Sequence, residues 1–326
     1  MKNIKLRPAE LDRDFGKLAN LFSIQQGEPT SEARLKLDYR EHKGRIIRLM
    51  IAEDEQGEMV GFNWVTRSRF GADQAYFYLM VVPGQYGQGV GHQLYADLEA
   101  VAQIAGISQL QVNIRDDFPA ARTFAAGLGF IEQSHSVGLE LDLVGFNDVR
   151  YDPAIEKLKY EGFQFTSLED LGDTDAARRK LYHLNDTTNM ELIIAKGQHV
   201  WLSFYDFKQK VCQMDWFIPG GQMVAIDRGT GIWAAMSAIT RYEGSEHAYN
   251  LHTGVDRRYH GRNLAQAVLV LALRYARNML KVSSVHTDED AHNLSSLAIY
   301  HELGYTSLPG IFSMEKTISS LVSPPS

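Results

Sequence analysis

A glycine-rich stretch from Val81 to Gly91 constrains the fold of this chain more than any other feature. It follows an apolar and aromatic run, Ala75 to Val82, which is typical of a buried strand. Its glycines stand at alternate positions, Gly87, Gly89 and Gly91. Apolar side chains at helical spacing come next, at Leu94, Leu98 and Val101. Because glycine lets backbone N–H groups turn toward a ligand, and a helix start adds unpaired N–H groups, the stretch predicts a phosphate or pyrophosphate site.

Two common nucleotide-binding motifs do not fit this stretch. A Walker loop requires Gly-Lys-Ser/Thr after its four spacer residues, and no lysine follows here. A dinucleotide-binding fingerprint requires a third glycine where this chain has Leu94. A plain turn between a strand and a helix, with no ligand, is the alternative interpretation of this stretch taken alone.

The chain contains a second copy of the same pattern, which indicates a duplicated domain. Residues 253–265 repeat it, and in the repeat Asn263 stands in place of Gly89. The matching residues of the second copy are Val255, Gly261 and Ala265, against Val81, Gly87 and Gly91 in the first. Further on, residues 125–130 and 300–305 both end in Leu-Gly followed by an aromatic residue. Two matches in the same order predict two domains of one architecture.

Composition narrows the class of protein. A chain of 326 residues is long enough for two domains, and its 44% hydrophobic and 22% charged residues are ordinary for a globular protein. The net charge of −7 argues against general nucleic-acid binding, which requires a basic face. The single cysteine, Cys212, allows no internal disulfide and suits a reducing cytoplasm. We expect no membrane span and no signal peptide, because no apolar run is long enough and the N-terminus leads directly into a strand pattern.

Hydrophobic periodicity and turn residues predict the same succession of elements in each half. In the first half we expect strands at 4–8, 46–53, 59–66, 75–82, 110–114 and 139–143, with two helices after the first strand, one after the glycine loop and one at 120–127. In the second half we expect helices at 153–160, 171–184 and 264–279, and strands at 162–166, 223–227, 232–240, 247–255 and 284–287. The aromatic residues between 185 and 217 belong to the core or line an acceptor pocket.

The glycine loop and this element order resemble the GNAT superfamily of acyl-CoA-dependent N-acetyltransferases. The loop of that family reads V-x-P-x-x-Arg/Gln-G-x-G-x-G/A, and Tyr86 stands where Arg or Gln is usual. The resemblance implies an α/β (α+β) fold of two tandem domains, each a mixed, mostly antiparallel sheet with helices on both faces and with splayed fourth and fifth strands. It places the domains at 1–148 and 149–318, and we expect the tail 319–326 to be disordered.

The resemblance also implies acetyl-CoA as the co-substrate, with the pantetheine arm between the two splayed strands. The implied cofactor-binding residues of the first half are Val81, Val82, Tyr86, Gly87, Gln88, Gly89, Val90 and Gly91. Those of the second half are Val255, His260, Gly261, Arg262, Asn263, Leu264, Ala265 and Asn293.

A tyrosine on the short helix after the fifth strand commonly serves this family as the acid for the departing sulfur. Tyr300 occupies that position in the second half, where Ala125 occupies it in the first. Asn293 likewise matches an asparagine that contacts the CoA arm, and the first half has Phe118 there. A phenol with an unperturbed pKa of about 10 keeps its proton at neutral pH and can donate it. The alternative for Tyr300 is a structural aromatic on a helix.

The base that takes the proton of the amine is left open by the sequence. The family often has a glutamate on the fourth strand, six residues before the valine, where this chain has Tyr249 and, in the first half, Ala75. His247 and His252 lie nearby, but alternate strand residues face opposite sides of a sheet. Proton loss through ordered water, or binding of an amine that is already neutral, are further alternatives.

Residues 286–292 contain two histidines and three acidic residues, yet we expect no metal there. An EF-hand that starts at Asp288 would need glycine at its sixth position and glutamate at its twelfth, where the chain has Asn293 and Ile299. A polar strand end followed by a helix cap accounts for this composition.

We therefore expect a cytoplasmic, acetyl-CoA-dependent N-acetyltransferase that acts on a small-molecule amine, with the chemistry in the second half. The first half then binds CoA or has a structural role. Alternatives are a non-catalytic acyl-CoA-binding or sensing protein and a transferase with a longer acyl donor. We expect a monomer or homodimer without nucleic-acid, membrane or metal partners.

Overall fold

The computed structural model describes residues 4–26, 30–69, 71–190 and 199–319 of the chain. It divides into two compact units, one of residues 1–134 and 311–326 and the other of residues 135–310. The chain passes from one unit to the other twice, within strand β6 (Ile131–Asp142) and within strand β12 (Thr306–Thr317). Of the tail that we expect to be disordered, residues 320–326 lie outside the described part.

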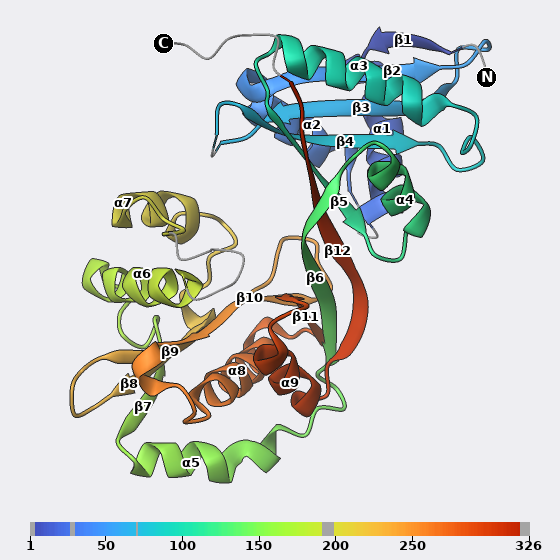
Figure 1. Cartoon of the computed structure of the whole chain (residues 1–326). Coiled ribbons are helices and arrows are strands. Elements are labelled where there is room, and N and C mark those ends of the chain that lie inside the picture. The colour runs from blue at the N-terminus through green and yellow to red at the C-terminus, as the bar shows by residue number, and fades with distance from the viewer. Residues whose placement is uncertain (1–3, 27–29, 70, 191–198, 320–326) are drawn as a thin grey trace. The chain divides into compact units, whose positions relative to one another are not determined.

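Unit 1 follows the predicted order of elements (Figure 1). Its elements before β6 are β1 (Lys5–Pro8), α1 (Leu11–Gln26), α2 (Glu32–His42), β2 (Ile46–Glu53), β3 (Met59–Arg67), β4 (Gln74–Val81), α3 (Val90–Ile104), β5 (Gln109–Arg115) and α4 (Pro119–Gly127). Ser31 caps α2 by accepting a hydrogen bond from the Arg34 amide.

The sheet of unit 1 has the order β1-β2-β3-β4-β5-β12. Its neighbouring strands pair antiparallel except β4–β5, which is parallel. That parallel pairing runs only from Gln74 opposite Gln109 to Tyr76 opposite Gln111. Beyond it the two strands continue unpaired with each other, so they form a fork.

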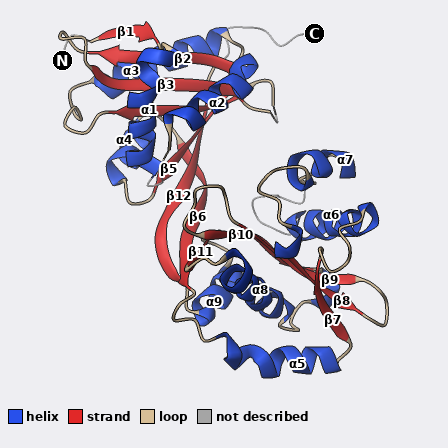
Figure 2. Ribbon diagram, turned by 180° about the vertical axis from the view of Figure 1, so that it is seen from behind, coloured by secondary structure: helices blue, strands red, loops and turns tan. Residues whose placement is uncertain are grey.

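Unit 2 repeats the arrangement (Figure 2). Its elements between β6 and β12 are α5 (Asp152–Tyr160), β7 (Phe163–Ser167), α6 (Asp175–Met190), α7 (Phe204–Phe207), β8 (Gln222–Asp227), β9 (Trp233–Thr240), β10 (Ala248–Val255), α8 (Leu264–Tyr275), β11 (Ser284–Asp290) and α9 (Leu294–Leu303). The sheet order is β6-β11-β10-β9-β8-β7, and β10–β11 is its parallel pair. Only Ala248–Val285 and Tyr249–His286 are paired before these strands separate.

Helices cover both faces of each sheet, because separate apolar cores lie on the two sides. In unit 1 one core joins α1 and α2 to the sheet, and another joins α3 and α4 to it. In unit 2 one core surrounds α8, and the other holds α6, α7 and several of the aromatic residues between 201 and 217. The mixed, mostly antiparallel sheets with splayed parallel strands confirm the predicted fold class.

The unit boundaries depart from the consecutive ranges 1–148 and 149–318. Residues 136–142 of β6 pair with β11 in unit 2, and residues 311–317 of β12 pair with β5 in unit 1. Strand pairing between distant segments, which hydrophobic periodicity does not reveal, therefore sets the division. No helix in the described ranges is both long and apolar enough to cross a membrane.

Candidate functional site

The fork of unit 2 begins with an irregularity in β10. The register of β10 against β9 shifts between Asn250 and His252, so Leu251 is an extra residue in the strand. Such a bulge bends a strand and changes the direction of its side chains, and bulges are frequent beside active sites. In unit 1, β4 pairs with β3 in unbroken register from Ala75 to Val81.

A buried network of polar side chains fills the fork of unit 2. The Tyr300 hydroxyl, carried by α9, donates to the Asn250 Oδ1 at 3.2 Å. The Thr253 hydroxyl donates to the same oxygen at 3.1 Å, and the Asn250 Nδ2 donates to the Ser237 Oγ at 2.9 Å. On β11, the Thr287 hydroxyl donates to the Asn250 carbonyl at 2.9 Å. The network therefore connects β9, β10, β11 and α9 at the point where the parallel strands separate.

Burial raises the pKa of Tyr300 to about 12, and hydrogen bonds with Thr287 and Thr253 offset this only in part. The side chain is 4% exposed. The pKa lies above the ordinary value of about 10 because a buried phenolate has lost its hydration. The hydroxyl keeps its proton at neutral pH and acts as a hydrogen-bond donor.

Asn293 has a structural role at the start of α9. Its Oδ1 accepts from the Ser296 amide as the N-cap of the helix, and its Nδ2 donates to the Glu289 Oε1 at 3.1 Å. Burial raises the pKa of Glu289, whose negative charge in turn helps to raise that of Tyr300. The interpretation of residues 286–292 as a polar strand end and helix cap gave no role to the Glu289 carboxyl group beside the site.

His252 lies just after the bulge and faces α6. Its Nε2 is 2.7 Å from the Thr188 Oγ1, and the Thr188 hydroxyl is itself 2.8 Å from the Leu184 carbonyl. Since that carbonyl can only accept, the hydroxyl donates to it and the imidazole Nε2–H donates to Thr188, which leaves the Nδ1 lone pair free. Burial lowers the pKa of His252 to about 4, so the ring is neutral at pH 7. A group with so low a pKa is a weak base for an alkylammonium ion.

The loop of unit 2 leads from β10 into α8. Gly261 and Asn263 have positive φ angles of 76° and 60°, and Asn263 precedes the first helical residue, the buried Leu264, with Ala265 next. The His260 Nε2 lies 3.0 Å from the Val255 carbonyl, and Arg262 pairs with Glu161 at 3.2 Å. The loop thus brings cationic and helix-terminal N–H groups together.

The loop of unit 1 has more glycine and no charged side chain between residues 83 and 91. Gly84, Gly87 and Gly89 all have positive φ, and Gly89 precedes the buried Val90 at the start of α3. Val82 donates to the Val60 carbonyl, Gln88 donates to the Gly84 carbonyl, and a Cβ at Gly91 would meet the Phe124 ring at 3.3 Å. The structure therefore places the predicted residues Val81 to Gly91 between the end of β4 and the first turn of α3.

The fork of unit 1 is apolar. Ala125, at the position of Tyr300, is buried in the core that also holds Phe77, Val112 and Ile114. Phe118, at the position of Asn293, packs edge-on against Tyr86 with ring centroids 6.2 Å apart. None of the side chains of Ala125, Phe77, Val112 and Ile114 could donate a proton.

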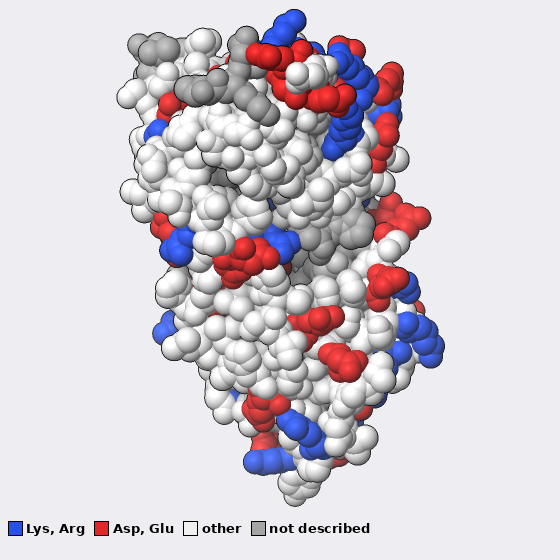
Figure 3. Space-filling view, turned by 90° about the vertical axis from the view of Figure 1, so that its right-hand side faces the viewer, with Lys and Arg blue, Asp and Glu red and all other residues white. Residues whose placement is uncertain are grey.

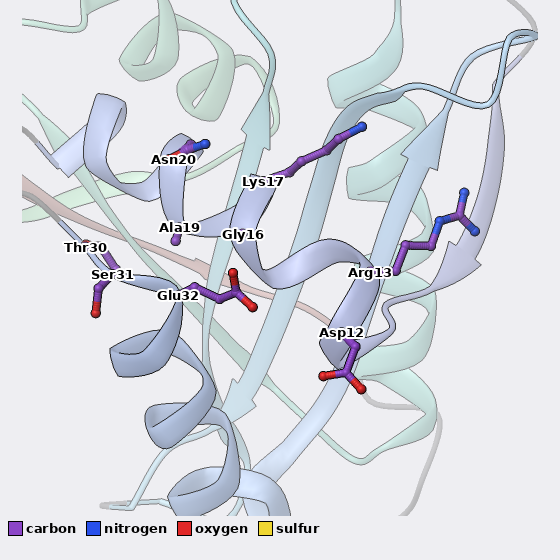
Figure 4. Close-up of a pocket in the computed structure, with 9 residues that line it drawn as sticks. All are labelled: Asp12, Arg13, Gly16, Lys17, Ala19, Asn20, Thr30, Ser31 and Glu32. Atoms are coloured by element: carbon purple, nitrogen blue, oxygen red, sulfur yellow. The ribbon is translucent and has the colours of Figure 1, made fainter.

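A separate pocket of about 520 Å³ lies between α1 and α2 of unit 1 (Figure 4). Figure 4 shows Asp12, Arg13 and Lys17 on α1 and Glu32 at the start of α2 around it. Lys36 pairs with both Asp12 and Glu32, at 3.1 and 2.8 Å. Both acidic side chains of the pocket therefore share one lysine of the same unit.

Comparison with known proteins identifies the family. The model of the acetyltransferase (GNAT) family matches residues 15–130 and 190–305, and no curated protein sequence matches the chain. The fold is similar to that of a GCN5-related N-acetyltransferase from Sphaerobacter thermophilus, at 17% identity over 96% of this chain and 95% of that one, with a TM-score of 0.72. A tandem GNAT protein from the clavulanic acid biosynthesis pathway has a TM-score of 0.69 at 18% identity, with 97% and 98% of the two chains covered.

A third similar structure is a glucosamine N-acetyltransferase region in a fungal multi-domain β-N-acetylglucosaminidase. Its TM-score is 0.72 at 17% identity, and the match covers 97% of this chain and 38% of that one. Identities this low show a shared fold. Together with the two regions of the family match, they confirm the tandem architecture that the loop motifs predict.

Proposed function

Because the chain belongs to the GNAT acetyltransferase family, we propose that it transfers an acetyl group from acetyl-CoA to a small-molecule amine, with the chemistry in unit 2. The observation that carries this proposal is the polar fork, where Tyr300 donates to Asn250 between the separating strands β10 and β11. Unit 1, with Ala125 and Phe118 at the corresponding positions, binds CoA or has a structural role.

In the proposed reaction the amine nitrogen attacks the carbonyl carbon of the thioester. A carbon–nitrogen bond forms, the carbon–sulfur bond breaks, and the electron pair leaves on sulfur. The Tyr300 hydroxyl stabilises the departing thiolate by donating to it, and CoA leaves as the thiol. The proton lost by the amine balances the one gained by sulfur. Backbone N–H groups of β10 beside the bulge are the donors available to the thioester oxygen.

Neither Tyr249 nor His252, both on β10, is a strong acceptor for the proton of the amine. Tyr249 occupies the position of the family glutamate, and His252 is a weak base because burial lowers its pKa to about 4. This combination supports an acceptor amine that loses its proton to water before or during attack. We therefore propose an acceptor of modest basicity, whose neutral form is present at neutral pH.

The surface charge agrees with a small acceptor. Figure 3 shows Lys and Arg interspersed with Asp and Glu on one face of the molecule, without a continuous basic patch. The net charge of −7 also disfavours nucleic acid. We propose a cytoplasmic enzyme, monomeric or homodimeric, that uses no nucleic-acid or membrane partner.

One other function has specific support, and a second is compatible with the same residues. A non-catalytic acyl-CoA sensor is favoured by the apolar fork of unit 1 and by the absence of the usual glutamate at Ala75 and Tyr249. A transferase with a longer acyl donor would use the same loops.

Calorimetric titration with CoA, acetyl-CoA and longer acyl-CoA esters, followed by turnover assays on a panel of amines, separates these functions. We expect acetyl-CoA to bind and free CoA to appear only when an amine is present. Binding without turnover of any amine would support the sensor, and preference for a longer ester would correct the donor.

A further inference from the structure

Unit 2 holds a cluster of metal-ligating side chains at the base of the polar fork, distinct from the network around Asn250. Glu140 on β6 lies directly opposite His286 on β11 in the antiparallel register, and His247 immediately precedes β10. One ligand atom from each of the three lies within 4.8 Å of the others. Leu139, Leu141 and Val285 face the core around α8, so the alternating residues Glu140 and His286 face the other side of the sheet.

The three side chains of the cluster contact one another. The His286 Nε2 is 3.2 Å from the Glu140 Oε1, and the rings of His247 and His286 stack with centroids 4.1 Å apart. The His247 Nδ1 lies 3.0 Å from the Ser284 Oγ. If that nitrogen donates to the hydroxyl, the Nε2 of His247 keeps its lone pair for a ligand. Hydrogen bonding of the second ring nitrogen is the usual way in which proteins fix a metal-binding imidazole.

We propose that Glu140, His247 and His286 bind a divalent transition-metal ion, with Zn²⁺ as the best match. Two imidazoles and one carboxylate form a ligand set that Zn²⁺ accepts, and water completes its four-coordinate shell. Ca²⁺ and Mg²⁺ prefer oxygen ligands, so a site with two nitrogen ligands disfavours them. On binding, the ion replaces the hydrogen bond between His286 and Glu140. The Nε2 proton of a neutral His286 ring then moves to Nδ1, whereas a cationic ring releases it to solvent.

The position of the cluster gives the ion a structural consequence. Its ligands come from β6, from β11 and from the residue before β10. His286 belongs to the last parallel pair before the fork opens. An ion at this point connects the three strands at the base of the fork. We therefore expect Zn²⁺ to raise the melting temperature of the protein. The expectation of no metal was based on residues 286–292 alone. Glu140 and His247 lie far from that stretch in the sequence, so the cluster could not be recognised from it.

The test is calorimetric titration of the chelator-treated, full-length protein with ZnCl₂. We expect one ion per chain, and loss of more than about 10-fold in affinity for His286→Ala and for His247→Ala. Glu140→Gln keeps the size of the side chain but removes its charge, and should weaken binding in the same direction. His301→Ala is the matched control, because His301 is an exposed histidine of the same unit on α9.

Two further measurements keep the result interpretable. Circular dichroism of each metal-free variant establishes that it is folded. Co²⁺ substitution should give the visible absorption bands of a four-coordinate site in the parent and His301→Ala proteins, and not in His247→Ala or His286→Ala. Zn²⁺ binding that is equal in the parent, His247→Ala and His286→Ala proteins would overturn the proposal, as would the lack of any binding by the folded parent. Neither outcome bears on acetyl transfer, because these three residues have no part in the proposed reaction.

Discussion

The two forks of the molecule share a backbone and differ in chemistry. Each opens after a short parallel pairing, β4 with β5 in unit 1 and β10 with β11 in unit 2. In unit 1 the space is filled by core residues such as Phe77 and Ile114. In unit 2 it is filled by the hydrogen-bonded group around Asn250 and Tyr300. Burial of polar groups costs free energy unless each finds a partner, so a polar fork indicates a function that an apolar one cannot perform.

The two loops that precede α3 and α8 also differ, in their glycine content and in their charged side chains. Unit 1 has glycine at positions 87, 89 and 91 but no charged side chain in the loop, whereas unit 2 replaces two of these glycines and adds Arg257, Arg258 and Arg262. Backbone N–H groups therefore dominate the first loop, and cationic side chains supplement them in the second. The comparison implies that duplication left one unit with the polar fork and the other with the simpler backbone loop.

Tyr300→Phe should have the largest effect on this comparison. The change removes one hydroxyl and little volume, so we expect the fold and the CoA affinity to persist while turnover falls by roughly 100-fold. Initial rates of CoA release with an accepted amine measure the effect. Ala125→Tyr in the same background should restore nothing, because Phe118 and the apolar fork remain.

Tyr305→Phe is the matched control for this change. Its ring lies 5.0 Å from that of Tyr300, and its buried hydroxyl has no hydrogen-bond partner among the described residues. We expect full turnover and a gain in stability of about 1 kcal/mol, since an unsatisfied buried polar group is removed. If Tyr300→Phe kept full turnover while disruption of residues 87–91 abolished it, the active site would move to unit 1.

The second prediction concerns the pH dependence of stability, which His252 should give to unit 2. Its pKa is lowered to about 4 in the folded protein, against about 6.5 when unfolded, so the unfolded state binds more protons between these values. Stability should therefore fall by up to about 2 kcal/mol as the pH is lowered from 7 to 5. Urea denaturation at the two pH values measures this loss.

His252→Gln should reduce that pH dependence, because an amide does not titrate. Tyr78→Phe serves as the control, since Tyr78 has the corresponding place on β4 of unit 1 and does not ionise in this pH range. A pH dependence that is equally steep in the His252→Gln protein would show that other groups determine it.

Gly87→Val and Gly261→Val test the two loops against each other. Both glycines have φ angles near 75°, at 74° and 76°, and a Cβ on either meets open space, where we expect the phosphates. Each change should weaken CoA binding in its own unit by about 10-fold, because a branched side chain strains the loop and covers its amides. Calorimetry should show the loss of one class of site, and turnover should fall with Gly261→Val alone. Loss of turnover with Gly87→Val alone would reverse the assignment of the units.

Local sequence patterns were sufficient for the duplication and for most of the order of elements, though not for α7 or β12. The fork followed from the resemblance to the GNAT superfamily. Proline, glycine and hydrophobic spacing act within a few residues, and the register from Val255 to Tyr300 followed from them. The partners of Tyr300 could not be predicted in this way, because Asn250, Thr253 and Thr287 meet only after β10 and β11 pair. The same is true of Thr188 with His252, of Glu140 with His286, and of the exchange of β6 and β12 between units.

The smallest expected effect comes from exchange of the residue that precedes each loop helix. Asn263 has a φ of 60° and Gly89 a φ of 89°, a region where glycine is unstrained and asparagine is tolerated at some cost. Asn263→Gly should therefore stabilise the protein and Gly89→Asn should destabilise it, each by less than about 1 kcal/mol in free energy of unfolding. Thermal denaturation should show the two changes as a small rise and a small fall in melting temperature. If Asn263→Gly instead lowered CoA affinity while stability rose, the asparagine side chain would contact the ligand, and unit 2 would depend on side chains where unit 1 depends on backbone.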